Sequence, residues 1–344
     1  MARIGLIGCG DVARFGHVPA ILHTPNLELV AHYDPHAHNA HLISNLAPHS
    51  KAFSDSKEFF DQGLEAVVIC SAAGAHKDNL FAAAERGLHV LCEKPLALLD
   101  SDAEAMVAEM ERVDRMLFTG FVYRFSLVAK QIKEWVQSGE AGKIRSLRLI
   151  YIWDLHGEYI QDKNNEWIRS PRFAGRMEEG GPMVDCGVHQ IDLARWWLQS
   201  EIRDVSAAGA WVANYEAPDH VYLHLDHVNG AHSMVEMSFS YGHNAREPLP
   251  HFSYHLIGDG GVIRYDRDGY ILELRHGTGT LRVPGSSEKN FEGMYDAFST
   301  ALITGKPGDL ATGRDGLIAT RIAKDATDQL IANRKHPLGL DQTS

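Results

Sequence analysis

Five short apolar runs alternate with helical patterns over the first 121 residues of the chain. The runs are Arg3 to Gly8, Leu27 to Asp34, Leu64 to Ser71, His89 to Glu93 and Met116 to Phe121. One helical segment, from His76 to Arg86, stops at Gly87, and another opens at Ser101, where Ser101 and Glu104 have the spacing of a capping box. Strands buried on both faces are continuously apolar, and parallel neighbours need crossover connections. The pattern therefore predicts an α/β fold whose first domain is a doubly wound parallel sheet.

The rest of the chain has a different pattern. Alternating stretches, typical of half-buried strands, run from Ile144 to Ile152 and from Val221 to Val228 and predict a largely antiparallel sheet. Helical patterns cover Leu127 to Gln137, residues 186–198, Phe291 to Ile303 and Asp315 to Ile331. At about 150 residues per domain, a chain of this length predicts two domains, which we place at 1–123 and 124–344. The last ten residues are expected to be a frayed tail.

Composition narrows the classes of function. The formal charge of −12 is opposite to the basic field needed to bind nucleic acid or an anionic membrane. The four cysteines, Cys9, Cys70, Cys92 and Cys186, form no metal-binding or disulfide pattern and predict free thiols in a reducing compartment. Neither a secretory signal nor an apolar run of transmembrane length is recognisable, so we expect a cytoplasmic globular enzyme.

The segment Gly8-Cys9-Gly10-Asp11-Val12-Ala13 directly follows the first apolar run and precedes a helical pattern. A dinucleotide-binding fingerprint belongs at this position: one glycine permits the tight turn, a second admits the pyrophosphate, and a small residue follows. Gly8, Gly10 and Ala13 take these places. Asp11 and Val12 open the helix, whose unpaired N–H groups attract an anion. The alternative is a plain strand-to-helix turn without a ligand.

Asp34 ends the second apolar run, 21 residues after Ala13. A carboxylate at this position can accept hydrogen bonds from an adenosine ribose, and it repels a 2′-phosphate. It therefore predicts NAD as the cofactor, with NADP as the weaker candidate. In the alternative interpretation, Asp34-Pro35 only initiates a turn.

Lys94 lies in Cys92-Glu93-Lys94-Pro95, at the carboxyl end of a predicted strand. Open parallel sheets bind their ligands at this edge. A lysine there could orient a substrate hydroxyl and stabilise the alkoxide that develops from it. The alternative is a solvated lysine beside a turn proline.

A second candidate group follows the double glycine Gly180-Gly181. If the segment from Asp185 onward is helical, Asp185, His189 and Asp192 lie on one face. Histidine can accept a hydroxyl proton near neutral pH, and a neighbouring carboxylate can orient it. A structural histidine is the alternative.

Trp153, His156, Trp167 and Arg169 are candidate substrate contacts, because aromatic faces and polar groups suit sugar rings. Ordinary packing beside a loop is the alternative for them. Among the 20 histidines, a cluster of His220, His224, Asp226, His227 and His232 suggests a metal at first sight. On a strand, however, His220 and His224 share one face while His227 points to the other. We therefore expect no metal there and favour a polar sheet face or a subunit contact.

Taken in order, these motifs resemble those of the Gfo/Idh/MocA oxidoreductases, the family of glucose-fructose oxidoreductase and inositol dehydrogenase. The matching segments are Gly8-Cys9-Gly10 with Ala13, Glu93-Lys94-Pro95, and Gly180-Gly181 followed by Asp185 and His189. Weaker matches are Tyr123-Arg124-Phe125, Gly139 to Ile144, Gly258 to Gly261 and Ala301 to Pro307. The resemblance spans nearly the whole chain.

The resemblance implies an NAD(P)-binding Rossmann domain and a substrate-binding α+β domain whose large, mostly antiparallel sheet mediates homodimers or homotetramers. It implies hydride transfer between NAD(P) and a sugar, an inositol-like polyol or a related alcohol. It assigns catalysis to Lys94, Asp185 and His189. Beyond the glycine loop and Asp34, it assigns cofactor contacts to Ser71, His76, Glu93, Lys94 and Arg124. The segment from Ser71 to His76 departs from the family pattern, and only His76 matches it clearly.

In the oxidising direction, His189 would remove the hydroxyl proton, Lys94 would stabilise the oxyanion, and Asp185 would orient His189 or a second hydroxyl. Two alternatives remain. One is an NAD-dependent glycosidase or lyase that oxidises its substrate only transiently. The other is a non-catalytic, NAD-responsive sensor, against which the presence of all three catalytic residues argues.

Overall fold

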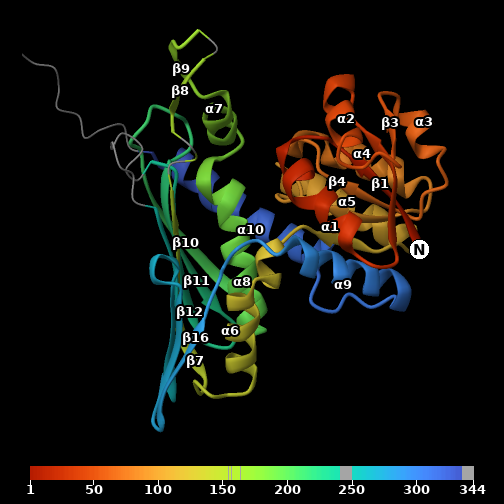
Figure 1. Cartoon of the computed structure of the whole chain (residues 1–344). Coiled ribbons are helices and arrows are strands. Elements are labelled where there is room, and N and C mark those ends of the chain that lie inside the picture. Colours follow the sequence, from red (N-terminus) through yellow and green to blue (C-terminus); the bar gives the residue numbers. More distant parts are fainter. Residues whose placement is uncertain (154, 156, 163, 241–249, 335–344) are drawn as a thin grey trace, which may run out of the picture. The chain divides into compact units, whose positions relative to one another are not determined.

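The structure is a computed structural model that describes residues 1–153, 155, 157–162, 164–240 and 250–334. It consists of two compact units (Figure 1). The first unit contains residues 1–138 and 284–321, and the second contains residues 139–283 and 322–344. The predicted division near residue 123 marks the end of the parallel strands, whereas the first unit continues to Ser138 and takes in a later segment of the chain. The predicted frayed tail, residues 335–344, lies outside the described residues.

The first unit is built on a seven-stranded sheet in the order β17-β6-β5-β4-β1-β2-β3. Its strands are β1 Ala2–Ile7, β2 Leu27–Tyr33, β3 Lys51–Phe53, β4 Ala66–Ile69, β5 His89–Cys92, β6 Leu117–Thr119 and β17 Ala311–Thr312. All are parallel except β17, which pairs antiparallel with β6. The predicted doubly wound sheet is confirmed. The short edge strands β3 and β17 escaped prediction because neither forms an apolar run.

Helices cover both faces of this sheet, as a doubly wound fold requires. They are α1 Val18–His23, α2 Ala37–Ser44, α3 Ser56–Phe60, α4 His76–Ala84, α5 Asp100–Arg112 and α9 Phe291–Thr304. Helix α6 Leu127–Gln137 packs against the 3₁₀ turn Val122–Phe125. One core cluster joins Ile4 and Leu29 to Met294 of α9, and another joins Val67 to Leu80 of α4. The alternation of side chains along each strand supplies both clusters. Among the described residues, no helix combines the length and apolarity needed to cross a membrane.

The predicted capping box at Ser101 is wrong. Helix α5 begins one residue earlier, at Asp100, and its N-cap is Leu99, which makes no side-chain cap. The Asp100 carboxylate instead accepts a hydrogen bond from Ser101 N at 2.8 Å. Asp100 and Asp102 place negative charge in the first turn, where the helix dipole favours it.

The second unit is built on an eight-stranded sheet in the order β10-β11-β12-β7-β13-β14-β15-β16. Its strands are β7 Ile144–Ile152, β10 Ile202–Ala210, β11 His220–His227, β12 His232–Ser238, β13 His251–Gly258, β14 Gly261–Asp266, β15 Ile271–His276 and β16 Gly279–Pro284. Strands β12 and β7 are parallel, whereas β10 with β11, β11 with β12, β7 with β13, β13 with β14 and β14 with β15 pair antiparallel, so the predicted mostly antiparallel sheet is confirmed. Helix α10, Gly313–Ala332, runs across the boundary at Arg321 from the first unit into the second.

Helix α8, Val188–Leu198, packs on one face of this sheet and is buried along its whole length. Its Trp197 ring meets Tyr254 of β13 edge to face, with ring centroids 5.0 Å apart. Helix α7, Pro171–Glu178, and the hairpin of β8 Tyr159–Gln161 and β9 Trp167–Arg169 precede it in the chain (Figure 1).

Candidate functional site

A cavity of about 440 Å³ opens at the carboxyl edge of the parallel sheet. Its walls come from the segments after β1, β2 and β4 and from α4. The lining residues are Ile7, Gly8, Cys9, Gly10, Tyr33, Asp34, Pro35, His36, Asn39, Cys70, Ser71, Ala72, Ala75 and Asn79. The cavity lies beside β1 and β4, where the chain changes its direction of winding. Doubly wound sheets bind their ligands at this switch point.

The two loop glycines differ in what surrounds them. Gly8 has φ +89°, and a Cβ there would lie 2.5 Å from the backbone N of Ser71. A Cβ on Gly10 would meet no atom within 4 Å. Gly8 therefore lets the ends of β1 and β4 pack closely, whereas Gly10 leaves open space in the cavity wall. That space, at the start of a helix, fits the pyrophosphate of a dinucleotide.

Asp34 connects the glycine loop to the end of β2. Its Oδ2 accepts a hydrogen bond from Cys9 N at 2.9 Å, and its Oδ1 accepts from His36 N at 2.9 Å. The second bond is the turn geometry of an aspartate, so the turn interpretation holds. Because Asp34 also lines the cavity, it remains a candidate ribose contact. Among the described residues, those that line the cavity include the Asp34 carboxylate and neither lysine nor arginine.

Glu93 and Lys94 follow β5, the strand next to β4, and neither is among the residues that line the cavity. Glu93 is buried, and Lys94 is half-buried. Burial alone would raise the pKa of Glu93, but the hydrogen bond and charge of His17, with the charges of Lys94 and Lys289, lower it to about 2. The carboxylate beside Lys94 is therefore ionised at neutral pH.

The other predicted cofactor residues are divided between the cavity and its supports. Ser71 lines the cavity, while His76 is buried beneath it with Nε2 3.0 Å from Ser71 O. Arg124 lies in the 3₁₀ turn Val122–Phe125, where its guanidinium donates to Asp309 O at 3.3 Å and pairs with Asp315 at 3.4 Å. Asp11, Val12 and Ala13 open the first helix, and none of the three lines the cavity.

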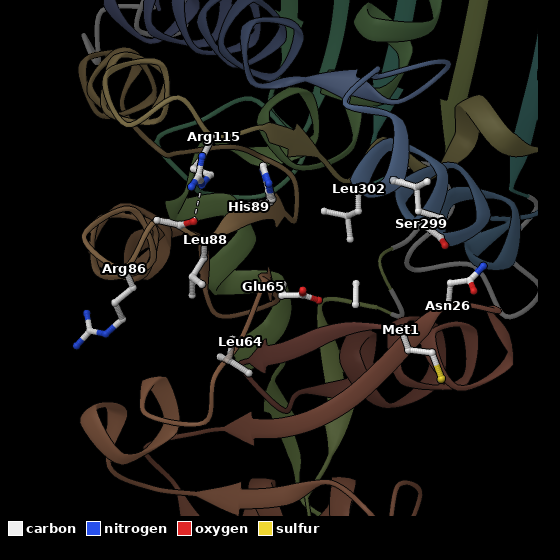
Figure 2. A pocket seen from close by; sticks show the side chains of 13 residues that line it. Met1, Asn26, Leu64, Glu65, Arg86, Leu88, His89, Arg115, Ser299 and Leu302 are labelled. Atoms are coloured by element: carbon white, nitrogen blue, oxygen red, sulfur yellow. Dashed lines mark hydrogen bonds between the residues drawn. The ribbon is translucent and has the colours of Figure 1, made fainter.

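A second cavity, of about 650 Å³, lies at the amino ends of β1 and β5 (Figure 2). Its polar groups already bond within the unit. Arg115 Nε donates to Gly87 O at 2.5 Å, and His89 Nδ1 accepts from Met116 N at 3.0 Å. This position is opposite to the edge at which doubly wound sheets bind ligands, and we assign it no function.

In the second unit, Asp185 and His189 are both buried. Asp185 Oδ1 lies 3.8 Å from Arg176 Nε, and Cys186 Sγ lies 3.4 Å from Asp185 Oδ2. Although burial lowers the pKa of Arg176, the carboxylates of Asp185 and Glu179 raise it above its ordinary value. A guanidinium therefore faces the negative charge of Asp185.

The helix that carries these residues contains a π turn near its start. Met183–Gly187 form a π turn, and α8 starts only at Val188. Of the three residues predicted to share a face, His189 and Asp192 therefore lie in the α-helix, whereas Asp185 lies in the π turn before it. Gly180 and Gly181, with φ of +121° and +72°, make the sharp turn that leads into it. The helix after the glycine loop also begins with a π turn, Ala13–His17, and such turns are frequent at functional sites.

The predicted substrate contacts show ordinary packing as well as exposure. The Trp153 ring stacks on Tyr151 with centroids 5.7 Å apart. Trp167 is 70% exposed on β9. Arg169 pairs with Glu158 at 3.2 Å and lies over the Tyr215 ring. His156 lies outside the described residues.

The strand histidines bond to one another and to carboxylates. His224 Nδ1 lies 3.1 Å from His232 Nε2, and His232 Nδ1 lies 2.8 Å from Asp226 Oδ1. His227 is buried on the other face, as the strand period predicted. Within the described ranges, no group of three His, Cys, Asp or Glu side chains could hold a metal ion.

Several contacts of these sites escaped the sequence analysis. His17 and Tyr295 were missed because their partners are distant in the chain. Asn39 and Asn79, which line the cavity, had no motif around them. Arg176 could have been noticed, since it precedes the double glycine by one helical turn.

Comparison with known proteins identifies two family models in the chain. Residues 2–121 match the model described as the oxidoreductase family with an NAD-binding Rossmann fold. Residues 129–264 match the GFO/IDH/MocA C-terminal domain. The two matches fall on either side of residue 123.

Among curated relatives, glucose-6-phosphate 3-dehydrogenase of Bacillus subtilis is 30% identical over 88% of this chain and 87% of its own length. The scyllo-inositol 2-dehydrogenase (NAD(+)) of the same species is 28% identical over 83% of this chain and 78% of its own. The match to myo-inositol 2-dehydrogenase of Thermotoga maritima, at 29% identity, spans 62% of this chain and 60% of that relative.

Solved structures support the fold. A probable dehydrogenase from Thermotoga maritima has a TM-score of 0.76 at 25% identity, covering 95% of this chain and 97% of its own. An oxidoreductase from Agrobacterium radiobacter, solved with NAD+, L-tartaric acid and magnesium, has a TM-score of 0.81 at 23% identity, covering 97% of both chains.

Proposed function

Because the chain belongs to the Gfo/Idh/MocA family of NAD-binding oxidoreductases, we propose that it transfers hydride between NAD and a CH–OH group of a sugar, an inositol-like polyol or a related alcohol. The observation that carries the proposal is the cavity at the switch point of the sheet, with Gly10 and Asp34 in its wall. The named relatives, which act on a sugar phosphate and on inositols, support this substrate class.

Bound NAD would supply the hydride acceptor, held by the glycine loop and Asp34. Lys94 would stabilise the negative charge that develops on the substrate oxygen. His189 would accept the hydroxyl proton, and Asp185 would orient His189 or a second hydroxyl. The Arg176 guanidinium, with Nε 3.8 Å from Asp185 Oδ1, places a positive charge beside that carboxylate.

NAD rather than NADP is the cofactor that the cavity favours, because the described residues of its wall include the Asp34 carboxylate and neither lysine nor arginine. Calorimetric titration of the purified protein should show tighter binding of NAD. In Asp34→Asn, which keeps the shape of the side chain, the preference should shrink by about tenfold or more, since the repulsion of the 2′-phosphate is removed. A wild-type protein that prefers NADP would refute the assignment.

The activity itself is tested by following the absorbance of reduced cofactor. Purified protein is mixed with NAD or NADP and a panel of aldoses, inositols, sugar phosphates, anhydrosugars and diols. Formation of NADH with a member of the panel supports the proposal. Conversion of a glycoside without net NADH would instead indicate transient oxidation, and tight NAD binding with no conversion would indicate a sensor.

We further propose that the protein is cytoplasmic and forms a homodimer or homotetramer through the second sheet. The four free cysteines support a reducing compartment. The face of the sheet opposite α8 exposes Tyr222, Ile257, Val262 and Ile271, and exposed apolar side chains on one face suit a subunit contact.

A further inference from the structure

A chain of hydrogen bonds leads from a distant helix to the backbone of Lys94. The Tyr295 hydroxyl on α9 lies 2.6 Å from His17 Nδ1. His17 Nε2 lies 2.8 Å from Glu93 Oε1, and Glu93 Oε2 accepts from Lys94 N at 3.1 Å. The tyrosine, the histidine and the carboxylate come from α9, from the π turn after β1 and from the end of β5, all in the first unit.

The direction of these hydrogen bonds follows from the groups at the two ends of the series, the Tyr295 hydroxyl and the Glu93 carboxylate. Burial raises the pKa of Tyr295 well above its ordinary value, so its hydroxyl stays protonated and can donate. The ionised Glu93 can only accept. His17 Nε2 therefore donates to Glu93, while its Nδ1 shares a hydrogen bond with the Tyr295 hydroxyl. The bond to Tyr295 thus fixes the His17 ring in the orientation in which Nε2 reaches Glu93.

The backbone after Lys94 has a separate support. His76 Nδ1 lies 3.1 Å from Pro95 O and 3.2 Å from Leu96 O, and its Nε2 faces Ser71 O. Removing the Tyr295 hydroxyl would leave these contacts in place. A change at Tyr295 therefore tests the orientation and charge at Glu93 while the loop stays folded.

We propose that His17, with Tyr295 behind it, is a positioning residue that fixes the Glu93 carboxylate against Lys94 and thereby sets the charge environment of the lysine. The proposal rests on the catalytic role proposed above for Lys94. His17 does not line the cavity, so its effect on the reaction passes through Glu93 and Lys94.

The groups around Glu93 define what happens when the bond to His17 is lost. They are the ammonium groups of Lys94 and Lys289, the thiols of Cys70 and Cys92, and the ring of His76. Burial raises the pKa of both thiols, so they stay neutral at pH 7. Without the His17 bond, the Glu93 carboxylate is no longer held in place and can turn away from Lys94, so Lys94 loses part of the negative charge that favours its ammonium form.

The test measures the acetylation of each lysine against pH by mass spectrometry, on the cofactor-free full chain. In Tyr295→Phe and in His17→Gln, the midpoint of the Lys94 profile should move to lower pH by about half a unit or more. Lys77 and Lys133, which pair with Asp102 and Asp309, serve as internal references and should not move. Met294→Ala, which truncates a fully buried side chain on the same helix, is the matched control.

Turnover supplies the second readout. Tyr295→Phe should lower kcat about tenfold, while the dissociation constant for NAD stays within about twofold of wild type. An unchanged Lys94 profile in both variants, or an equal shift in Met294→Ala, would overturn the positioning role. Failure of the proposed function would be distinguishable from failure of the positioning role. In that case the wild-type protein would form no NADH with any substrate of the panel, independently of the Lys94 acetylation profile.

Discussion

Lys94 is the residue on which the proposed chemistry most depends. Replacing it with alanine removes the positive charge that we propose stabilises the substrate oxygen. We expect kcat to fall by about 10²- to 10³-fold, a loss typical for one charge-stabilising group. The affinity for NAD, measured by fluorescence titration, should change little because Lys94 does not line the cavity.

The control for this variant is Lys77→Ala, which removes a partly exposed lysine paired with Asp102. Its turnover should equal that of the wild type. Near-normal turnover in Lys94→Ala would rule out the catalytic role of Lys94. Loss of NAD binding in this variant would instead indicate that Lys94 contacts the cofactor.

Glu93 should make the stability of the protein depend on pH. Its pKa is about 2 in the folded chain, against an ordinary value of 4.5, so the unfolded chain takes up the proton first as the pH falls. The stabilisation of the folded chain by the ionised Glu93 carboxylate is fully present above about pH 4.5 and is lost as the pH falls from there to about 2. The Glu93→Gln variant lacks this stabilisation at every pH. The difference in free energy of unfolding between wild type and Glu93→Gln should therefore shrink as the pH falls from about 4.5 to about 2.

Urea unfolding at pH 7, 5, 4 and 3 measures this difference. Glu288→Gln, at an exposed glutamate, is the control and should follow the wild type at every pH. A difference between Glu93→Gln and wild type that stays constant from pH 7 to pH 3 would contradict the low pKa.

At the scale of the element, the two glycines of the loop should have different roles, Gly8 in the stability of the fold and Gly10 in the binding of NAD. Gly8→Ala should destabilise the first unit, because the new Cβ would lie 2.5 Å from Ser71 N and the backbone has φ +89°. Gly10→Ala meets no atom within 4 Å, so thermal unfolding should stay within about 1 °C of wild type. Its NAD affinity should nevertheless fall by about tenfold or more, since the methyl group would occupy the pyrophosphate space.

Each glycine variant serves as the control for the other. Calorimetry gives the unfolding temperature, and titration gives the affinity for NAD. If Gly10→Ala bound NAD like the wild type, the loop would be a plain strand-to-helix turn, which the sequence alone also allowed.

The same scale shows what local patterns predict well. The helix Leu127–Gln137 and the strand Ile144–Ile152 have the predicted bounds, because each is bounded by clear turn signals and has an unbroken period. The π turns at Ala13–His17 and Met183–Gly187 were not predicted, because one extra residue in a helical turn does not visibly change the spacing of apolar residues in the sequence. Both turns lie in segments that carry functional candidates.

At the scale of the whole molecule, the open face of the second sheet should carry the subunit contact. Ile257 and Val262 lie opposite each other on neighbouring strands and are 51% and 38% exposed. Replacing both with aspartate would place charge in an apolar contact, so a dimer or tetramer should dissociate. Light scattering after size exclusion measures the mass.

Ile303→Asp, at an apolar residue that is 69% exposed on α9, is the matched control and should keep the wild-type mass. A wild-type protein of monomer mass would contradict the proposed oligomer. An oligomer that survives the double substitution would place the contact on another surface.

The sequence by itself determined the parallel sheet, the glycine loop, Asp34, and the candidates Lys94, Asp185 and His189. These features depend on the order of residues within one strand, turn or helix, and local sterics fix them. Tertiary structure alone brought Tyr295 to His17, across 278 positions of the chain, and His17 to Glu93, across 76. It also gave the two loop glycines different surroundings. Contacts between distant segments form only when the sheet and helices pack, so no local pattern can encode them.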